Sequence, residues 1–330
     1  MATTRQGAFR LFRFADIDVF VHWTWLLVAW YELAYRRNDY QSPFWNVLEY
    51  LSVFAIVTVH EFGHALACRQ VGGLANQIML WPLGGVAFVQ PPPRPGALLW
   101  SILAGPLVNV LLVPITIGAY VAAQRAGLDQ TAPDASRYVF MMAWINGLLL
   151  LFNMLPIYPL DGGQALQAVL WFAIGRAWSL LVVSSIGLVV GALLVVVCLV
   201  SGNIWLAILS FFIASRGLVG FRQGQTLARL MRAPRHTQFA CPACGMSPPA
   251  GDYWTCGRCH TRFDTFAQQG HCPGCGGESL PTQCVHCHAR HPLAQWLTGQ
   301  RPAGGPVVEA SLLERAPSDG NPYASPHDSG

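Results

Sequence analysis

Long apolar stretches, each close to the length that crosses a lipid bilayer, constrain this chain more than any other feature of its sequence. A transmembrane helix needs about 20 largely apolar residues. Of the 330 residues, 53% are hydrophobic and only 11% are charged, an apolar share above that of ordinary soluble domains. The sequence predicts an α-helical polytopic membrane protein with about six transmembrane helices in a domain at 19–221. We expect the helices at 19–35, 46–70, 97–120, 138–155, 179–200 and 203–221.

Two segments between these stretches are apolar but interrupted by Pro and Gly. The segment 74–90, LANQIMLWPLGGVAFVQ, has two short apolar arms around Gly84 and Gly85, which predicts a short membrane-associated β-hairpin. Residues 155–163, LPIYPLDGG, are broken in the same way before the chain turns helical. Irregular backbone at membrane depth has to be shielded from lipid or line a wet cavity, so the second segment indicates a site.

Arginine residues mark both ends of the apolar region. With six spans both ends fall on one side, which the positive-inside rule makes cytoplasmic, including an N-terminal segment at 1–18. Arg36 and Arg37, after the first stretch, argue mildly against this orientation. All 20 basic residues are Arg, as in GC-rich bacterial genomes, so we expect the bacterial inner membrane. The arginines concerned are Arg5, Arg10 and Arg13, and Arg216, Arg222, Arg229, Arg232 and Arg235.

The second apolar stretch contains the sequence HEFGH, from His60 to His64. On a helix, residues four apart differ by about 40° and share a face, which is the geometry of two zinc ligands with Glu61 beside them as general base. A charge in the bilayer centre costs about 2.5–3.5 kcal/mol on insertion scales, so such residues are candidates for function. A catalytic zinc takes three protein ligands and keeps one open position. Asp161 is the clearest ionisable residue in the other apolar segments and is the candidate third ligand.

At this point the sequence resembles a known family. HEFGH at 60–64, LAGPLVN at 103–109 and NMLPIYPLDGG at 153–163 are similar to the signature motifs of the site-2 protease family of intramembrane zinc metalloproteases. The resemblance implies the same ligands and base, and cleavage of membrane-embedded, single-pass protein substrates, as in regulated intramembrane proteolysis. It extends over about residues 10–220. In the second motif we expect Gly105 and Asn109 to allow tight packing and a hydrogen bond between helices.

The implied reaction assigns a role to Glu61 and suggests substrate contacts. Zinc lowers the pKa of its bound water to about 7, Glu61 takes the proton, and the hydroxide attacks the scissile carbonyl. A helical substrate has to unwind first, and strand addition to the hairpin around Gly84 and Gly85 would offset the lost hydrogen bonds. Asn153 either donates to the substrate backbone or the oxyanion, as the family motif suggests, or has a structural role, bridging helices or capping the break at Pro156.

A small cysteine-rich domain follows at 240–298, after a basic linker at 222–239 and before a disordered tail at 299–330. Four CxxC pairs are separated by 11, 12 and 8 residues. Four thiolates fill one tetrahedral site, so the pattern predicts a double zinc-ribbon-like domain with two structural zincs besides the catalytic one. Two pairings stay open: first with second and third with fourth, or first with third and second with fourth. The ligands are Cys241, Cys244, Cys256, Cys259, Cys272, Cys275, Cys284 and Cys287, and the expected core is Trp254, Phe263, Phe266 and Trp296.

The charges of this domain argue against a nucleic-acid partner. Residues 241–298 hold three Arg and three acidic residues, which gives no electrostatic footprint for phosphate. We therefore expect a cytoplasmic protein partner for the zinc domain.

Two other functional classes fit parts of the sequence. A membrane zinc carrier or sensor would bind metal without hydrolysis, but it has no need of Glu61 and would show further His or Asp pairs in other spans. A membrane anchor for the zinc domain would have no reason to keep catalytic-type groups in lipid.

Overall fold

A computed structural model describes residues 7–36, 38–81, 84–278, 281–287 and 289–297 of the chain. The chain divides into two compact units, Gly7–Gln225 and a C-terminal unit that begins at Thr226. The expected tail at 299–330 lies outside the described residues.

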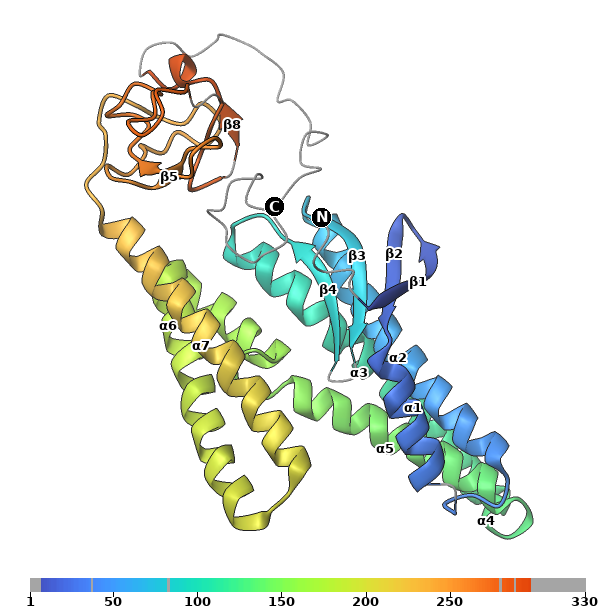
Figure 1. The fold of residues 1–330 in the computed structure, drawn as a ribbon. Coiled ribbons are helices and arrows are strands. Elements are labelled where there is room, and N and C mark those ends of the chain that lie inside the picture. Colours follow the sequence, from blue (N-terminus) through green and yellow to red (C-terminus); the bar gives the residue numbers. More distant parts are fainter. Residues whose placement is uncertain (1–6, 37, 82–83, 279–280, 288, 298–330) are drawn as a thin grey trace. The chain divides into compact units, whose positions relative to one another are not determined.

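The first unit consists of long helices and one small sheet (Figure 1). Its helices are α1 (Thr24–Tyr35), α2 (Pro43–Gln70), α3 (Pro95–Arg125), α4 (Leu128–Thr131), α5 (Pro133–Asn153), α6 (Asp161–Ser201) and α7 (Ile204–Arg232), which continues past the end of the unit. Its strands are β1 (Ala8–Phe14), β2 (Ile17–His22), β3 (Leu74–Trp81) and β4 (Gly84–Gln90).

Five helices of the described chain are long and apolar enough to cross a membrane. They are α2, α3, α5, α6 and the part of α7 at Leu206–Arg232, and they account for every expected stretch except the first. The expected class, a helical multi-pass integral membrane protein with a short hairpin and a small second domain, is confirmed.

The first apolar stretch, 19–35, does not form the expected spanning helix. Its beginning belongs to β2, with the sequence IDVFVH, and only the 12 residues of α1 are helical. Such a helix is about 18 Å long, well short of the roughly 30 Å hydrocarbon core. The β-branched residues Ile17, Val19 and Val21 alternate with other residues, and this period of two favours a strand over a helix.

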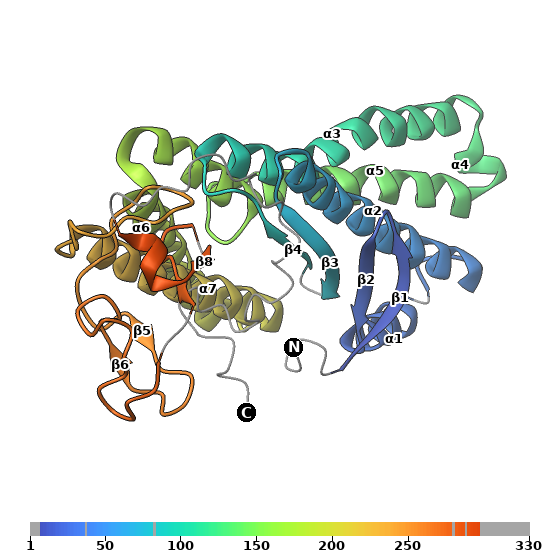
Figure 2. The same ribbon diagram turned by 90° about the horizontal axis from the view of Figure 1, so that it is seen from above.

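The expected hairpin at 74–90 is confirmed and belongs to a larger sheet. Strands β3 and β4 are antiparallel, with Gly84 opposite Trp81 and Gly85 opposite Leu80. Strands β1 and β2 extend the sheet in the order β1-β2-β3-β4, with β2 parallel to β3. Its apolar face packs on the second half of α2, where Ala65 and Cys68 are fully buried (Figure 2). Strands β1 and β4 are therefore the two edges of this sheet.

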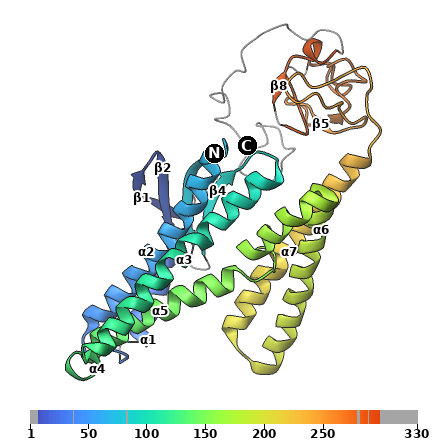
Figure 3. The ribbon, with the colours of Figure 1, turned by 180° about the vertical axis from the view of Figure 1, so that it is seen from behind.

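Helices α2, α3 and α5 pack side by side and position the HEFGH segment (Figure 3). Helix α2 begins after Ser42, whose hydroxyl accepts a 3.4 Å hydrogen bond from the Phe44 N–H. Its Gly63 faces α3 so closely that an added Cβ would lie 2.6 Å from the Ala104 carbonyl oxygen. Only glycine permits this approach, which brings HEFGH against the LAGP segment of α3.

Helix α6 starts at Asp161, after the non-helical residues 154–160. The helix is interrupted at Gly175, where φ is 79° and ψ is 166°. Its second half packs against α7 through small residues, and a Cβ on Gly191 would lie 3.0 Å from Ala214. The Pro and Gly residues of the LPIYPLDGG segment thus place a helix N-terminus at Asp161.

The second unit is small and poor in regular structure. Its elements are β5 (Trp254–Thr255), β6 (Arg262–Phe263), β7 (Thr282–Gln283), β8 (Arg290–His291) and the short 3₁₀ helix η1 (Leu293–Trp296). The two strand pairs, β5-β6 and β7-β8, are both antiparallel. The expected aromatic core is confirmed, because Trp254, Phe263, Phe266 and Trp296 are all buried.

Candidate functional site

Three side chains from two distant segments converge inside the first unit. His60 and His64 lie one turn apart on α2, and Asp161 is the first residue of α6. His60 Nε2 is 3.1 Å from His64 Nε2 and 3.1 Å from Asp161 Oδ2, and His64 Nε2 is 3.4 Å from Asp161 Oδ2. All three side chains are at most 14% exposed. The structure thus brings together the three residues that the sequence nominates as ligands.

The spacing of these three atoms fits a tetrahedral metal. A zinc bound to nitrogen and oxygen at about 2.0–2.1 Å holds neighbouring ligand atoms about 3.3–3.4 Å apart. The observed separations of 3.1–3.4 Å lie close to this value. Two imidazoles and one carboxylate are also the donor set of many catalytic zinc sites.

The outer nitrogen of each imidazole is held by a fixed acceptor. His60 Nδ1 donates to Asn109 Oδ1 at 2.5 Å, and His64 Nδ1 donates to the Ser101 carbonyl oxygen at 2.9 Å. Both acceptors belong to α3. A proton held on Nδ1 leaves the lone pair of Nε2 free for a metal, so α3 sets the tautomer of both candidate ligands.

Gly105 of α3 makes room for the His64 ring. A Cβ at this position would overlap His64 Nε2, because the two atoms would lie far inside van der Waals contact distance. Asn109 donates its Nδ2 to Asn146 Oδ1 of α5 at 2.8 Å. The expected close packing and helix–helix hydrogen bond in LAGPLVN are confirmed. Sequence reasoning missed Ser101 and Asn146. Their contacts are made between helices, and the sequence does not show which residues of neighbouring helices face one another.

The other predicted site residues lie in different settings. Glu61, the residue after His60 in α2, is buried. Asn153 ends α5, is half-buried, and its side chain has no hydrogen-bond partner within the described part of the chain. Gly84 and Gly85 open the edge strand β4.

The eight cysteines of the second unit form two groups of four. One group joins the first and fourth CxxC pairs, Cys241 and Cys244 with Cys284 and Cys287; the other joins the second and third, Cys256 and Cys259 with Cys272 and Cys275. Both pairings considered from the sequence are therefore wrong, because the inner group is nested within the outer one.

The sulfur separations in both groups suit zinc. Zinc–sulfur bonds of about 2.3 Å place tetrahedral sulfurs about 3.8 Å apart. The separations are 3.7 and 3.8 Å in the outer group and 3.6 and 3.5 Å in the inner group. The Thr261 hydroxyl, followed by its backbone N–H, lowers the pKa of the Cys259 thiol to about 6. That shift favours the thiolate, which is the form that binds metal.

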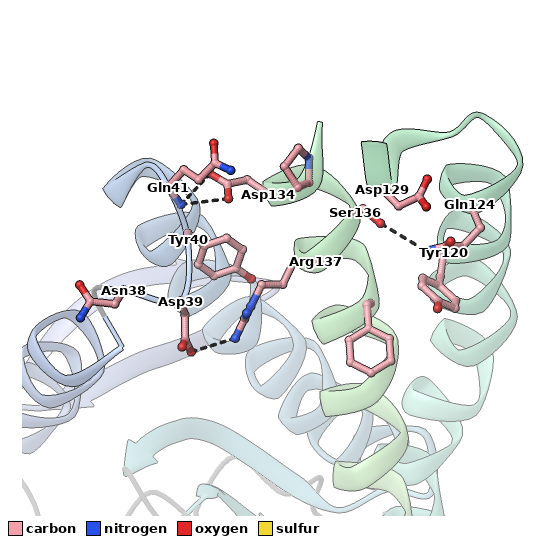
Figure 4. Close-up of a pocket in the computed structure, with 12 residues that line it drawn as sticks. Asn38, Asp39, Tyr40, Gln41, Tyr120, Gln124, Asp129, Asp134, Ser136 and Arg137 are labelled. Carbon is pink, nitrogen blue, oxygen red and sulfur yellow. Dashed lines mark hydrogen bonds and ion pairs between the residues drawn. The ribbon is translucent and has the colours of Figure 1, made fainter. Parts of the chain in front are cut away.

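A polar cavity of about 860 Å³ lies among the ends of α3 and α5 and the loop before α2 (Figure 4). Arg137 pairs with Asp39 at 3.2 Å, and Asp134 accepts the backbone N–H groups of Gln41 and Ser42. None of the predicted site residues lines it. Its charged groups fasten the loop to α5, so we assign it no part in the candidate chemistry.

The chain is similar to peptidase family M50, the family of the site-2 proteases. The sequence profile of this family matches residues 113–198. The chain is 31% identical over 206 residues to a zinc metalloprotease of Methanocaldococcus jannaschii, covering 62% of this chain and 58% of that protein. It is 31% identical over 227 residues to a protein of Mycobacterium tuberculosis named as the zinc metalloprotease Rip3, covering 63% and 57%. The chain thus spans less than two thirds of the length of these relatives.

Among solved structures, the site-2 protease from Methanocaldococcus jannaschii aligns with a TM-score of 0.48 at 27% identity. The alignment covers 65% of this chain and 95% of that one. The family profile and the zinc metalloprotease relatives confirm the family resemblance drawn from the three motifs.

Proposed function

We propose that this protein is an intramembrane zinc endopeptidase that hydrolyses peptide bonds of membrane-embedded proteins. The observation that carries the proposal is the buried cluster of His60, His64 and Asp161 at tetrahedral spacing, with the buried Glu61 next to His60 in the sequence. Within the described residues, the other groups of possible metal ligands are the two cysteine groups of the second unit. A carrier would need a relay of such groups along the spans, so the cluster favours hydrolysis over transport.

Each side chain has a defined part in this proposal. A zinc bound by His60, His64 and Asp161 would activate a water and polarise the scissile carbonyl. Glu61 accepts the proton of the attacking water and returns it to the leaving amine. The amide of Asn153, at the end of α5, has no hydrogen-bond partner among the described residues and donates to the substrate backbone or to the developing oxyanion.

The substrate class follows from the location of the cluster. The candidate ligands belong to helices that are apolar enough to span a membrane, so the scissile bond has to reach them in the bilayer. A single-pass helix that unwinds can replace its lost backbone hydrogen bonds by adding a strand at the edge of β4, beginning at Gly84 and Gly85. Regulated release of such a segment from the membrane is the proposed biological outcome.

The arginines at the end of α7 favour a cytoplasmic C-terminus by the positive-inside rule. We place the protein in a bacterial inner membrane with the zinc-binding unit in the cytoplasm. The balanced charges of that unit favour a protein partner over nucleic acid.

The test compares wild type with Glu61→Gln on a panel of single-pass membrane fragments in liposomes, with and without zinc chelation. We expect cleavage by wild type alone and full zinc content in the variant, since glutamine keeps the size of Glu61 but cannot take a proton. Cleavage that persists in Glu61→Gln would contradict the mechanism. If no fragment is cut and zinc crosses the liposome membrane, the carrier function takes its place.

A further inference from the structure

Asn146 is a polar side chain in the middle of an apolar helix. It lies in α5 beside Ile145, and it is completely buried. An amide buried in an apolar environment costs several kcal/mol (about 2–7) unless its groups are hydrogen-bonded. Asn146 satisfies its amide with two hydrogen bonds to a single residue. The identity of that residue therefore indicates the role of Asn146.

Both bonds of Asn146 go to Asn109 of α3. Asn146 Oδ1 accepts from Asn109 Nδ2 at 2.8 Å, and Asn146 Nδ2 donates to the Asn109 backbone oxygen at 3.1 Å. Asn109 is itself 1% exposed, and its Oδ1 accepts from His60 Nδ1 at 2.5 Å. A continuous chain of hydrogen bonds therefore runs from α5 through α3 to the candidate metal ligand on α2.

The direction of these bonds fixes the orientation of the Asn109 amide. If that amide turned over, its NH₂ group would face the Nδ1–H of His60, and two donors would meet. Asn146 Oδ1 opposes the turn because it holds the NH₂ group on the far side. A hydrogen bond that served only to join two helices could be formed with the Asn109 amide in either orientation.

We propose that Asn146 is a positioning residue for the metal ligand His60, acting through Asn109. It keeps the His60 proton on Nδ1 and the Nε2 lone pair aimed at His64 and Asp161. The inference rests on the proposed function, because it takes the cluster to be a zinc site. Mutation of residues that hold a metal ligand through hydrogen bonds typically lowers metal affinity by about 10- to 100-fold.

The test measures zinc per chain on the purified full-length protein, equilibrated with buffers of graded free zinc. His60→Ala sets the baseline supplied by the two cysteine groups, and wild type is expected to bind one zinc more. Asn146→Leu should need about 10- to 100-fold more free zinc for the same added occupancy. The control is Thr116→Val in α3, whose hydroxyl bonds to the Leu112 and Val113 carbonyl oxygens of its own helix, and it should leave this zinc affinity unchanged.

A second variant separates positioning from packing. In Asn146→Asp the buried carboxyl group stays protonated near neutral pH, because burial disfavours its charge. It then keeps one acceptor and one donor for Asn109, so we expect zinc affinity close to that of wild type. Unchanged thermal unfolding and retention of the cysteine-bound zincs would exclude misfolding of Asn146→Leu.

The outcomes distinguish the inference from the proposed function. Equal zinc affinity of wild type and Asn146→Leu overturns the inference, and so does an Asn146→Asp protein as weak as Asn146→Leu. If wild type binds no more zinc than His60→Ala, the zinc site itself fails, and the inference falls with it.

Discussion

The position of the candidate ligand His64 depends on the absence of a side chain at Gly105. Its ring occupies the place where any other residue at position 105 would put a Cβ. Gly105 therefore contributes no side chain to the site, yet it decides whether α3 can lie close enough for the Ser101 carbonyl oxygen to accept the hydrogen bond of His64 Nδ1–H.

Gly105→Ala should displace the imidazole of His64 and weaken zinc binding. A misplacement of about 1 Å at a reacting centre can cost about 100-fold in rate, so we expect cleavage to fall by at least about that factor. Zinc content and cleavage of the purified variant provide the measurement. The control is Gly118→Ala in the same helix, where the added Cβ meets no atom within 4 Å. Equal activity of the two variants would contradict the geometry.

At the scale of residues, the sequence predicts the candidate ligands but not what holds them. His60, Glu61 and His64 are local neighbours, so helical spacing alone puts them together. Asp161 is found because an ionisable residue stands out in an apolar segment. Ser101 and Asn146 carry no such signal: a serine and an asparagine in apolar helices are ordinary, and their partners depend on how three helices pack.

At the scale of elements, the first apolar stretch shows where hydropathy misleads. Its composition suits a spanning helix, but Ile17, Val19 and Val21 alternate and form β2 between β1 and β3. A strand at this position pairs with a neighbouring strand on each side, and hydropathy does not predict such pairing. The hairpin at 74–90 was predictable because Gly84 and Gly85 lie between two short apolar arms.

The interruption of α6 offers a test of backbone strain. Gly175 has a φ of 79° and a ψ of 166°, and an added Cβ would meet nothing within 4 Å. Gly175→Ala should therefore act through the backbone alone and cost about 1–3 kcal/mol. Thermal unfolding in detergent measures the loss of stability. Gly118→Ala again serves as the control, since its helical position should be neutral or stabilised by up to about 1 kcal/mol. A fully stable Gly175→Ala protein would mean that the two halves of α6 join without the interruption.

At the scale of the whole molecule, the two cysteine groups differ in shielding. In the outer group Cys241 and Cys284 are buried against Trp254, Phe266 and Trp296. In the inner group Cys259 and Cys275 are exposed. A chelator in solution reaches an exposed ligand more readily than one beneath an aromatic core.

Chelation should accordingly remove the inner zinc first. In a His60→Ala background, which lacks the intramembrane site, we expect two phases of zinc release to a chromogenic chelator, the faster one several-fold quicker than the slower. Replacing the four inner cysteines with serine should abolish the fast phase and keep the slow one. A single phase in the parent protein would argue that the two sites are equally accessible.

The nesting of the two groups could not be predicted from the sequence, because four evenly spread CxxC pairs look alike and only the folded chain selects partners.

The nested pairing can be tested directly by zinc stoichiometry in the His60→Ala background. Serine replacement of Cys256, Cys259, Cys272 and Cys275 should leave one bound zinc, because the outer four ligands survive intact. Either pairing considered from the sequence predicts none, since each site would lose half of its ligands. The matched control replaces the first two pairs, Cys241, Cys244, Cys256 and Cys259, and should leave no zinc, because it removes two ligands from each nested site. One zinc in that control and none in the first variant would mean that adjacent pairs share a metal.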